Sequence, residues 1–375
     1  MTAEVRRVAD ALPEDELLDL VRRCRAADGG MPLVTEPWFL RGRWLAAGTV
    51  AFEVRDGGAL IGAAAVRPSA GGPMLSGLVD PAFRGRGIGS ALLDTALAAA
   101  ADLAPTAGPA SAAAPASAAA LLPVADLPPA AGPASAVAPA SAAALVPVAD
   151  LPPAAGPASA AAPASAADVA PAAALASASV PASAAASAPA AGSVTVECEG
   201  FTSGAAELFA SRGLERVFGE DVMRIKPSAG GSEAGWPEGA TVVEWSDETA
   251  ERFHAVYAAS FRDRPGFPDP TAQEWIEENT EDDDFRAEWS ILATVPGHGD
   301  AGFVTAAEGW IVQVGVIPAV RGSGLGAALI RESLRRMAGA GATEAWLTVN
   351  VNNPSAARLY RWLGFEDMGQ RARYQ

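Results

Sequence analysis

Two short segments of this chain have the same pattern, and each follows an apolar run that a proline ends. The first reads RGRGIG and covers residues 84–89, and the second reads RGSGLG and covers residues 321–326. The runs before them, MLSGLV and WIVQVGVI, are typical of buried strands, and the residues after them open helices. Glycines let backbone N–H groups approach a ligand, and a helix N-terminus adds partial positive charge. Each turn therefore predicts a cradle for an anion such as a pyrophosphate.

A third pattern, NPSAARLYRWLGF, follows the second turn and a further strand. Together these segments resemble the GNAT (GCN5-related) N-acetyltransferase superfamily. In that family an Arg/Gln-x-x-Gly-x-Gly turn holds the pyrophosphate of acetyl-CoA, and the strand before the turn pairs with the pantetheine arm. Two such repeats in one chain further resemble the tandem architecture of mycothiol synthase. The resemblance covers essentially the whole chain outside one long insert.

The resemblance implies acetyl-CoA as a co-substrate, with binding residues in both repeats. Either turn has a plainer alternative, a tight packing turn that binds no cofactor. In the C-terminal repeat the expected contacts are Val314, Gly315, Val316, Arg321, Gly322, Ser323, Gly324, Leu325, Gly326, Ala327 and Asn353. In the N-terminal repeat they are Leu78, Val79, Arg84, Gly85, Arg86, Gly87, Ile88 and Gly89.

A tyrosine on the helix after the fifth strand often protonates the departing thiolate in GNAT enzymes. In this sequence Asn353 is expected to cap that helix, with Pro354 at its first position and Gly364 closing it. Tyr360 then shares the ligand-facing side, whereas an ungapped alignment places Phe209 at the same position of the first repeat. We therefore expect chemistry in the C-terminal repeat and a degenerate, structural or cofactor-binding N-terminal repeat. The alternative for Tyr360 is a core aromatic whose hydroxyl is hydrogen-bonded.

The sequence defines the general base less clearly. In the tandem relatives that the chain resembles, a glutamate begins the fourth strand, where this sequence has Trp310. Glu308, two residues earlier, either reaches the acceptor amine through water or caps a hairpin. Backbone N–H groups around residues 314–316 are the expected oxyanion donors.

Acceptor recognition depends on one charged segment. Residues 274–288 carry eight acidic side chains. These form either a negative rim that draws in a cationic amine or a solvated helix and loop. His254 and His298 are expected to face solvent rather than to act in catalysis.

An alanine-, proline- and serine-rich segment interrupts the first repeat. Residues 103–192 have three charged side chains and no aromatic one, and GPASA recurs at Gly108, Gly132 and Gly156. Such a segment buries too little apolar surface to fold, so we expect a disordered spacer, with partner docking as the alternative. The expected fold is α/β, with two tandem GNAT-like domains, each a mixed β-sheet flanked by helices. Their expected boundaries are 1–102 plus 193–227 for the first domain and 240–375 for the second.

Charge and composition narrow the classes of partner. The net charge of −17 argues against nucleic acid or an anionic membrane. Two cysteines and two histidines are too few for a disulfide scaffold or a zinc cluster, so no metal is expected. No apolar stretch is long enough to span a bilayer and the first residues lack a signal-peptide pattern, so we expect a cytoplasmic protein. The sequence does not indicate an oligomeric state.

The leading hypothesis is therefore an acetyl-CoA-dependent N-acetyltransferase that acts on the amine of a small molecule by direct attack on the thioester. The alternative is a catalytically inactive acyl-CoA-binding module whose insert recruits a partner.

Overall fold

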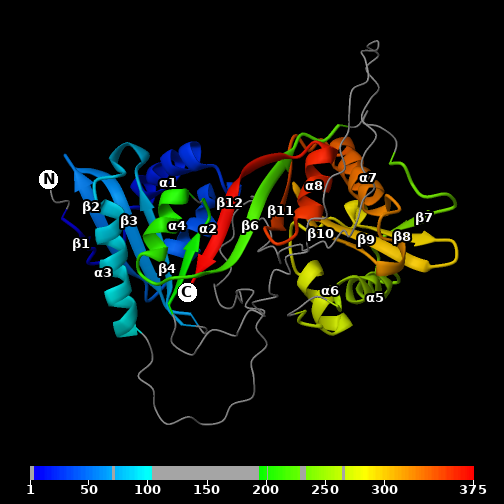
Figure 1. Cartoon of the computed structure of the whole chain (residues 1–375), viewed down its shortest axis with the longest axis horizontal. Coiled ribbons are helices and arrows are strands. Elements are labelled where there is room, and N and C mark those ends of the chain that lie inside the picture. Colours follow the sequence, from blue (N-terminus) through cyan, green and yellow to red (C-terminus); the bar gives the residue numbers. More distant parts are fainter. Residues whose placement is uncertain (1–3, 70–71, 104–193, 201, 229–233, 264–266) are drawn as a thin grey trace, which may run out of the picture.

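The computed structural model describes residues 4–69, 72–103, 194–200, 202–228, 234–263 and 267–375 (Figure 1). Within these ranges the chain contains two repeats of one α/β pattern. The first repeat contains β1 (Arg6–Arg7), α1 (Glu14–Asp28), the 3₁₀ turn η1 (Pro32–Thr35), α2 (Pro37–Leu40), the π-helical turn η2 (Arg41–Leu45), β2 (Val50–Asp56), β3 (Ala59–Arg67), β4 (Met74–Val79), the 3₁₀ turn η3 (Pro81–Phe83), α3 (Ile88–Leu103), β5 (Thr195–Cys198), α4 (Ser203–Ala210) and β6 (Arg216–Ile225).

The second repeat follows the same order of elements. It contains β7 (Thr241–Glu244), α5 (Ala250–Phe261), α6 (Ala272–Thr280), the 3₁₀ turn η4 (Ala287–Trp289), β8 (Ile291–Val295), β9 (Gly299–Ala307), β10 (Trp310–Val316), the 3₁₀ turn η5 (Pro318–Val320), α7 (Leu325–Gly339), β11 (Ala345–Asn350), α8 (Pro354–Leu363) and β12 (Glu366–Tyr374). Among the described residues, no helix combines the length and the apolarity that a membrane crossing requires.

All these strands join one mixed sheet, in the order β1-β2-β3-β4-β5-β12-β6-β11-β10-β9-β8-β7. Two neighbouring pairs are parallel, β4 with β5 and β10 with β11, and the other described pairs are antiparallel. The two parallel pairs occupy the same place in each repeat. This architecture confirms the expected mixed α/β fold with two related halves.

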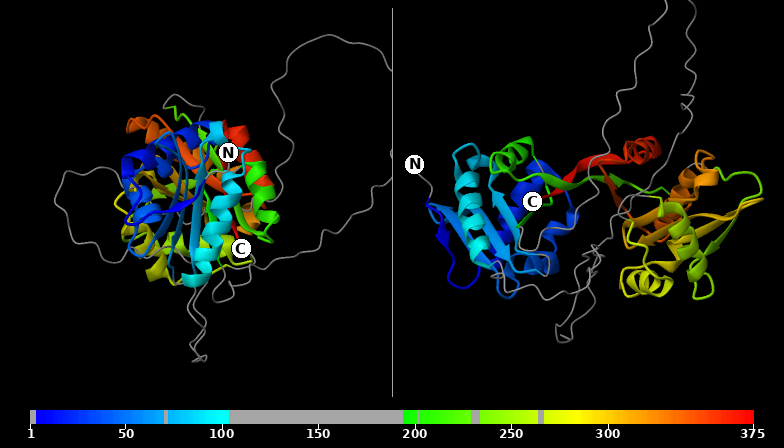
Figure 2. Two further views of the ribbon diagram at one scale, coloured as in Figure 1. Left: turned by 90° about the vertical axis from the view of Figure 1, so that its left-hand side faces the viewer. Right: turned by 60° about the horizontal axis from the view of Figure 1, so that its bottom comes forward.

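The last strand of each repeat is shared with the other repeat. Strand β12 lies between β5 and β6, so that Ala372 is paired with both Cys198 and Gly219. Strand β6 in turn pairs with β11 of the second repeat, with Val222 opposite Thr348. Figures 1 and 2 show β6 and β12 crossing between the two halves of the molecule. Each repeat therefore completes its sheet with a strand from the other, and the domain boundaries expected from the sequence stay a prediction.

Helices cover both faces of the sheet in each half. Along β3, Ala64 and Val66 belong to the core beneath α3 and α4, whereas Ala63 and Ala65 face α1. This alternation is the period of two that a strand imposes. In the second repeat α7 and α8 pack on one face and α5 and α6 on the other.

Helix α4 is shorter than its local sequence predicts. The sequence AAELFASRGLERVF predicts a helix over residues 205–218, but α4 ends at Ala210 and β6 begins at Arg216. Gly213 adopts a left-handed conformation (φ +74°) and reverses the chain direction. Val217 and Phe218 then continue in a strand, the conformation that branched and aromatic side chains favour.

Helix α3 leads the chain away from the first glycine-rich turn. Its 16 residues span about 24 Å, close to the roughly 20 Å of the six residues of β4. The helix therefore returns the chain to the end of the sheet where β5 begins, with Thr195 opposite Met74. The expected insert, residues 103–192, joins α3 to β5 at this end and lies outside the described residues, apart from Leu103.

Candidate active site

The candidate site forms where the parallel strands of each repeat separate. Strands β10 and β11 are paired only at Trp310 and Trp346. Strands β4 and β5 are paired from Met74 to Ser76. Beyond these pairs the strands no longer bond to each other, so each repeat has an opening in its sheet. The free edge of β10, or of β4, is then available to a bound molecule.

Only alternate residues of β10 direct their backbone groups into this opening. The N–H of Ile317 donates to β9 (2.9 Å), and Gly315 points the same way because strand residues alternate. Val314 and Val316 therefore face the opening. The guanidinium of Arg321 donates to the carbonyl of Val316 (3.2 Å), which fits this orientation. Of the three expected backbone contacts, Val314 and Val316 are placed to bind a ligand, and Gly315 is not.

Strand β4 has the same arrangement. The N–H of Asp80 donates to β3 (2.9 Å), so Leu78 faces β3 and Val79 faces the opening. The carbonyl of Val79 already accepts hydrogen bonds from Arg84 (3.1 Å) and from the thiol of Cys24 (3.4 Å). Arg84 and Arg321 thus make the same contact with the strand that precedes their turn.

The glycines of the two turns have nearly identical conformations. Gly85 and Gly87 have φ values of +73° and +81°, and Gly322 and Gly324 have values of +79° and +88°. An added Cβ at Gly85, Gly87 or Gly324 would meet no atom within 4 Å. Helices α3 and α7 start directly after these turns, at Ile88 and Leu325, and their first N–H groups have no partner within the helix. The open space and the free donors fit an anion such as a pyrophosphate.

The two turns differ in the charge state of the arginine that opens each of them. Arg84 binds the Asp28 carboxylate through two hydrogen bonds of 2.6 Å, and this pairing raises the pKa of Arg84 above its usual value. Arg321 instead donates to the backbone carbonyl of Ser260 (2.8 Å), and it has no ion-pair partner among the described residues. Burial lowers the pKa of Arg321, with an opposing effect from Asp263. Asp28 therefore neutralises the charge of Arg84, whereas the charge of Arg321 remains available to a ligand.

Arg86, the other charged residue of the first turn, folds back on that turn. Its guanidinium lies 4.9 Å from the centre of the Phe83 ring and donates to the carbonyl of Ala82 (3.2 Å). The equivalent residue of the second turn is Ser323.

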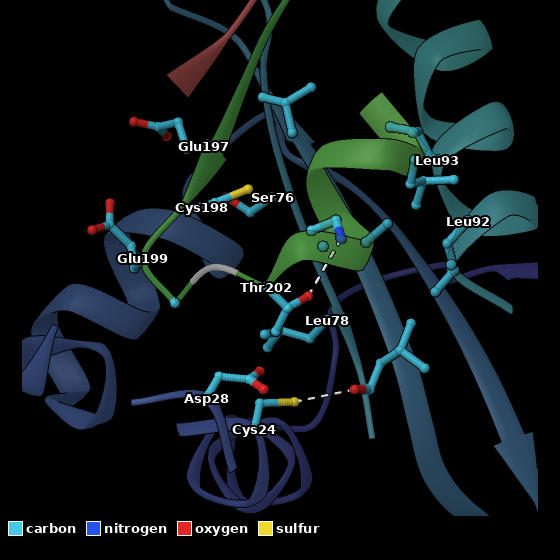
Figure 3. Close-up of a pocket in the computed structure, with 18 of the residues that line it drawn as sticks. Cys24, Asp28, Ser76, Leu78, Leu92, Leu93, Glu197, Cys198, Glu199 and Thr202 are labelled. Atoms are coloured by element: carbon cyan, nitrogen blue, oxygen red, sulfur yellow. Dashed lines mark hydrogen bonds between the residues drawn. The ribbon is translucent and has the colours of Figure 1, made fainter. Parts of the chain in front are cut away.

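A cavity of about 570 Å³ opens in the first repeat (Figure 3). It extends from the glycine-rich turn through the gap between β4 and β5. Leu92, Leu93 and Phe209 line its apolar part, Cys24 lies beside Asp28, and Cys198 lies between Glu197 and Glu199. Burial raises the pKa of Cys24 to about 11 and that of Cys198 to about 12. Both thiols are therefore protonated at neutral pH and are poor nucleophiles.

The charged end of this cavity belongs to a cluster of buried ion pairs. Glu197 binds Arg43 and Arg67, and the second carboxylate, Glu199, binds Arg43 at 2.7 Å. Burial opposes ionisation of Glu199, but the neighbouring arginines hold its pKa below the usual value. The cluster continues through Arg373, Arg371 and Glu220 on β12 and β6. The cluster thus connects residues that line the cavity to the strands that the two repeats share.

Helix α8 carries the candidate proton donor. The side chain of Asn353 accepts a hydrogen bond from Ala356 (3.2 Å), Pro354 is the first helical residue, and Gly364 ends the helix with φ +100°. These observations confirm the expected helix boundaries. Tyr360 is 1% exposed, and burial raises the pKa of its hydroxyl above the usual value. The phenol is therefore protonated at neutral pH.

The corresponding helix of the first repeat lacks this hydroxyl. Thr202 caps α4, as Asn353 caps α8, by accepting a hydrogen bond from Ala205 (3.3 Å). Phe209 then occupies the position that Tyr360 has in α8. Its ring lies 4.8 Å from that of Tyr374, so β12 of the second repeat covers it.

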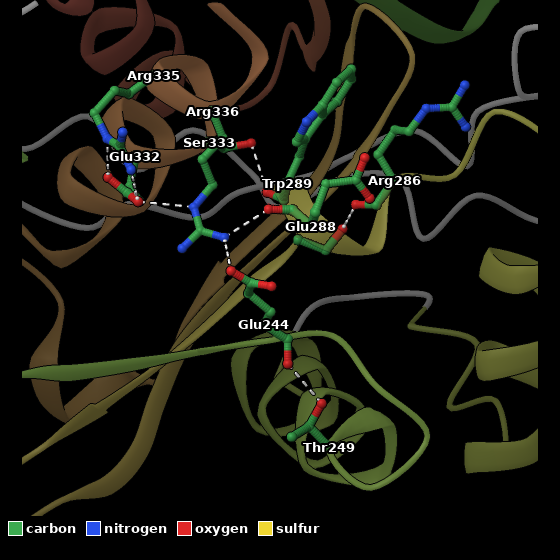
Figure 4. A network of polar contacts seen from close by, with 10 residues as sticks. Glu244, Thr249, Arg286, Glu288, Trp289, Glu332, Ser333, Arg335 and Arg336 are labelled. Atoms are coloured by element: carbon green, nitrogen blue, oxygen red, sulfur yellow. Dashed lines mark hydrogen bonds and ion pairs between the residues drawn. The ribbon is translucent and has the colours of Figure 1, made fainter. Parts of the chain in front are cut away.

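Helix α7, which begins at the second cradle, is anchored by a polar network (Figure 4). Arg336 donates to Glu332 in the same helix, to the carboxylate of Glu244 on β7 (2.6 Å) and to a backbone carbonyl of η4 (2.7 Å). Ser333 donates to the carbonyl of Trp289 (2.9 Å). These bonds hold the helix, and with it the cradle, against the sheet.

Glu308 lies in the turn between β9 and β10, at the opposite end of β10 from the cradle. The seven residues of β10 place it roughly 23 Å from the glycine-rich turn. Its carboxylate accepts a hydrogen bond from Arg286 (3.1 Å), and its N–H donates to the carbonyl of Asp284 (2.8 Å).

The acidic segment begins with α6 and continues into the loop after it. Asp284 is 3% exposed, one oxygen of its carboxylate has no hydrogen-bond partner among the described residues, and burial raises its pKa to about 6. Of the histidines, His254 contacts the carbonyl of Pro270 (2.9 Å) and His298 is exposed. In the part of the chain that the structure describes, no group of acidic, cysteine and histidine side chains could hold a metal ion.

One buried polar residue of β10 was missed by the sequence reasoning. Gln313 lies on β10, directly after a bulge, and accepts a hydrogen bond from the indole of Trp275 (3.1 Å). A glutamine within the apolar run WIVQVGVI was the signal that could have identified it.

Comparison with known families agrees with this geometry. Residues 243–365 match the acetyltransferase (GNAT) family, and residues 47–120 match a GNAT acetyltransferase domain. The chain belongs to the GNAT superfamily.

Curated relatives of this tandem GNAT protein include mycothiol acetyltransferases. That of Nocardioides sp. is 31% identical over 184 residues, which cover 43% of this chain and 61% of the relative. That of Kocuria rhizophila is 42% identical over 71 residues, which cover 19% of this chain and 22% of the relative. The matched regions thus span less than two thirds of these relatives.

Solved structures share the whole tandem GNAT fold. A GCN5-related N-acetyltransferase from Sphaerobacter thermophilus aligns with a TM-score of 0.57 and 21% identity, over 100% of this chain and 96% of that protein. A tandem GNAT protein from the clavulanic acid biosynthesis pathway aligns with a TM-score of 0.51 and 15% identity, over 99% and 98%. At this level of identity the likeness concerns the fold alone.

Proposed function

We propose that this protein is an acetyl-CoA-dependent N-acetyltransferase that acetylates the amine of a small molecule, with the chemistry in the C-terminal repeat. The observation that carries the proposal is the asymmetry of two otherwise matching sites. Both repeats have the glycine-rich cradle, but they differ at two equivalent positions. The arginine that opens the turn is paired with Asp28 in the first repeat and has no carboxylate partner among the described residues in the second. The helix that follows carries a tyrosine in the second repeat and a phenylalanine in the first.

In this proposal the cradle and the open strand bind acetyl-CoA as a substrate. The N–H groups at the start of α7 and the charge of Arg321 bind the diphosphate. The backbone groups of Val314 and Val316 bind the amides of the pantetheine arm, as a neighbouring strand would. The thioester then lies along β10, away from the cradle.

The reaction is a direct displacement. The lone pair of the neutral amine attacks the thioester carbonyl carbon, and the carbonyl π electrons move to oxygen. When the C=O bond reforms, the C–S bond breaks and the thiolate takes a proton from the hydroxyl of Tyr360. The proton that the new amide loses restores the tyrosine, directly or through water.

The first repeat has room for the pantetheine arm but lacks the chemistry. Its cavity of about 570 Å³ begins at the first cradle, which supports binding of a CoA thioester there. Phe209 cannot supply a proton to a thiolate, and Asp28 neutralises Arg84. We therefore propose that this repeat binds a CoA thioester more weakly and without turnover.

The acceptor is a small amine. Because the curated relatives are mycothiol acetyltransferases, the first acceptor to test is the amine of a cysteinyl sugar. The acidic segment 274–288 favours a cationic acceptor, so aminoglycosides belong in the same panel.

A second candidate function is an inactive acyl-CoA-binding module whose insert recruits a partner. It is favoured by the position of the large cavity, which lies in the repeat that lacks the tyrosine. In that case acetyl-CoA binds and no amine is acetylated.

Release of CoA thiol, measured across the amine panel, tests these proposals. We expect turnover with at least one amine, a fall in kcat of about 100- to 10,000-fold for Tyr360→Phe, and an unchanged dissociation constant for acetyl-CoA. Phe209→Leu is the matched control and should retain full turnover. Thiol release that is absent with every amine would reject the enzyme, and turnover that survives Tyr360→Phe would reject the proton donor.

A further inference from the structure

Gln313 is a buried polar residue in the middle of an apolar strand. It is 6% exposed, and its neighbours Ile311, Val314 and Val316 belong to the core beneath α7. A buried carboxamide that lacks hydrogen bonds costs roughly 1–3 kcal/mol, so each of its polar atoms needs an explanation.

Trp275 determines how this carboxamide is oriented. The indole Nε1 lies 3.1 Å from Oε1 of Gln313. An indole N–H only donates hydrogen bonds, so the atom that faces it is the carboxamide oxygen and the NH₂ group points away. Trp275 is itself fully buried, with its ring stacked on Tyr257 at 5.0 Å and tilted against Trp245 at 5.5 Å. The indole cannot swing aside, so the NH₂ group has a fixed direction.

The NH₂ group of Gln313 has no acceptor among the described residues. Val314 and Val316 point their side chains toward α7, so Gln313 and Gly315 face α5 and α6 across the sheet. A carboxamide NH₂ group donates two hydrogen bonds and accepts none. The ligand atom that it binds is therefore an acceptor such as a carbonyl oxygen, and not an ammonium group.

The backbone beside Gln313 supplies further donors. The register of β10 against β9 shifts between Ile311 and Gln313, which leaves Val312 as an extra residue. A bulge of this kind releases an N–H group from the strand ladder. The N–H of Val314, one residue after Gln313, faces the opening. The carboxamide of Gln313 and the backbone donor of Val314 thus belong to consecutive residues of β10.

We propose that Nε2 of Gln313 donates a hydrogen bond to the carbonyl oxygen of the bound thioester and stabilises the negative charge that this oxygen acquires during attack. Trp275 is a positioning residue, which acts through Gln313. The proposal rests on the proposed acetyl transfer in the C-terminal repeat. The electron pair of the C=O bond moves to the oxygen as the amine attacks, and it returns when the C–S bond breaks.

The first repeat lacks this donor. Its turn and strand match those of the second repeat residue by residue, and Ser76 then stands where the second repeat has Gln313. The side chain of a serine is shorter than that of a glutamine, and no tryptophan among the described residues orients the hydroxyl of Ser76. This difference adds to the absence of a tyrosine in explaining why the first repeat would not turn over.

Two substitutions separate catalysis from folding. Gln313→Glu keeps an oxygen for Trp275 and replaces the NH₂ group by a second oxygen, whereas Gln313→Leu removes both polar atoms at similar volume. We expect kcat to fall about 100- to 1,000-fold in both variants, the usual effect of removing one oxyanion donor, with the dissociation constant of acetyl-CoA within about 3-fold. Trp275→Phe should lower kcat less than either, and Ser76→Ala is the matched control that should leave kcat unchanged.

An infrared measurement tests the hydrogen bond without turnover. Acetyl-CoA labelled with ¹³C at the carbonyl is bound to the full chain that carries Gly87→Glu, so that the signal comes from the second cradle. The carbonyl stretch should lie at lower frequency than in solution, and Gln313→Leu should abolish that shift. An unshifted carbonyl, or no binding at all, would overturn the proposal. The proposal would also be overturned if kcat per folded molecule stayed unchanged in Gln313→Leu while Tm fell. That outcome would show that Gln313 contributes only to packing.

The same design separates the two proposals. If no amine is acetylated but the carbonyl stretch shifts through Gln313, the proposed enzyme fails and the proposed contact stands.

Discussion

The two glycine-rich turns offer a matched pair of substitutions, Gly324→Glu and Gly87→Glu. The two glycines have φ values of +88° and +81°, and an added Cβ meets no atom within 4 Å at either position. A side chain in this left-handed conformation costs about 1–2 kcal/mol. Because neither site adds a clash, both variants should lose the same amount of stability. Any difference between them in activity then reports on the ligand and not on folding.

At Gly324 the new carboxylate should repel the acetyl-CoA that is turned over. A new carboxylate about 6 Å from a phosphate charge, at an effective dielectric constant of about 20, raises the free energy of binding by roughly 3 kcal/mol per charge. A factor of ten in Kd corresponds to about 1.4 kcal/mol, so acetyl-CoA should bind the second repeat at least about 100-fold more weakly. Turnover would then be lost at ordinary concentrations. In Gly87→Glu the turnover should stay within about 2-fold, because we place the chemistry in the other repeat.

Three measurements complete this test. Thermal unfolding of the two variants checks that both are folded to the same extent, calorimetry with acetyl-CoA counts the binding sites, and thiol release gives kcat and KM. We expect each variant to lose one binding site and only Gly324→Glu to lose turnover. Equal losses of turnover would show that both cradles are needed, and a loss confined to Gly87→Glu would place the chemistry in the first repeat. The first result would refute a dispensable first cradle, and the second would refute the assignment of catalysis to the C-terminal repeat.

Three further predictions follow from the structure. The folded-state pKa of Asp284, about 6, lies above its usual 3.8, so the native protein binds the proton more tightly and loses stability as the pH rises from about 4 to 6. Asp284→Asn should therefore raise the free energy of unfolding at pH 7 by up to about 3 kcal/mol, and urea titrations at pH 4 and pH 7 should show the gain only at pH 7. Arg371→Met leaves the buried Glu220 without its partner at 2.7 Å and should cost about 3–5 kcal/mol, whereas the double variant with Glu220→Leu should recover much of this in the same titrations. Deletion of residues 107–188 should leave Tm and kcat unchanged, because α3 already returns the chain to the start of β5; aggregation or loss of turnover in that variant would contradict the spacer interpretation.

Much of the local structure could be predicted from the sequence because it depends on neighbouring residues. Pro318 and the glycines of the second turn specify where β10 ends and α7 begins, and Asn353 and Gly364 mark both ends of α8. The prediction failed at residues 205–218, where a helix-favouring composition continued past Gly213 into a strand. In that segment the pairing of β6 with β11 and β12 outweighs local propensity.

The candidate site could be predicted only in part. Repetition of the pattern predicted both turns. The family resemblance predicted a role for Tyr360, whose counterpart Phe209 follows from alignment alone. The direction of the backbone at Gly315 could not be predicted, since it depends on how β10 pairs with β9. The ion pair of Arg84 with Asp28 could not be predicted either, because the two residues are 56 positions apart in the chain.

The sequence by itself determined that the chain contains two copies of one strand, turn and helix unit, because proline, glycine and capping residues act over a few positions. Only the tertiary structure decided which strands pair, which of Arg84 and Arg321 has a carboxylate partner, and how the carboxamide of Gln313 is oriented. Strand β12, EDMGQRARY, has few residues that favour a strand, and neither its residues nor those of β6 indicate which strand it pairs with. The exchange of β6 and β12 between the two repeats depends on long-range hydrogen bonds between strands. These bonds join segments about 150 residues apart, as between Glu220 and Arg371.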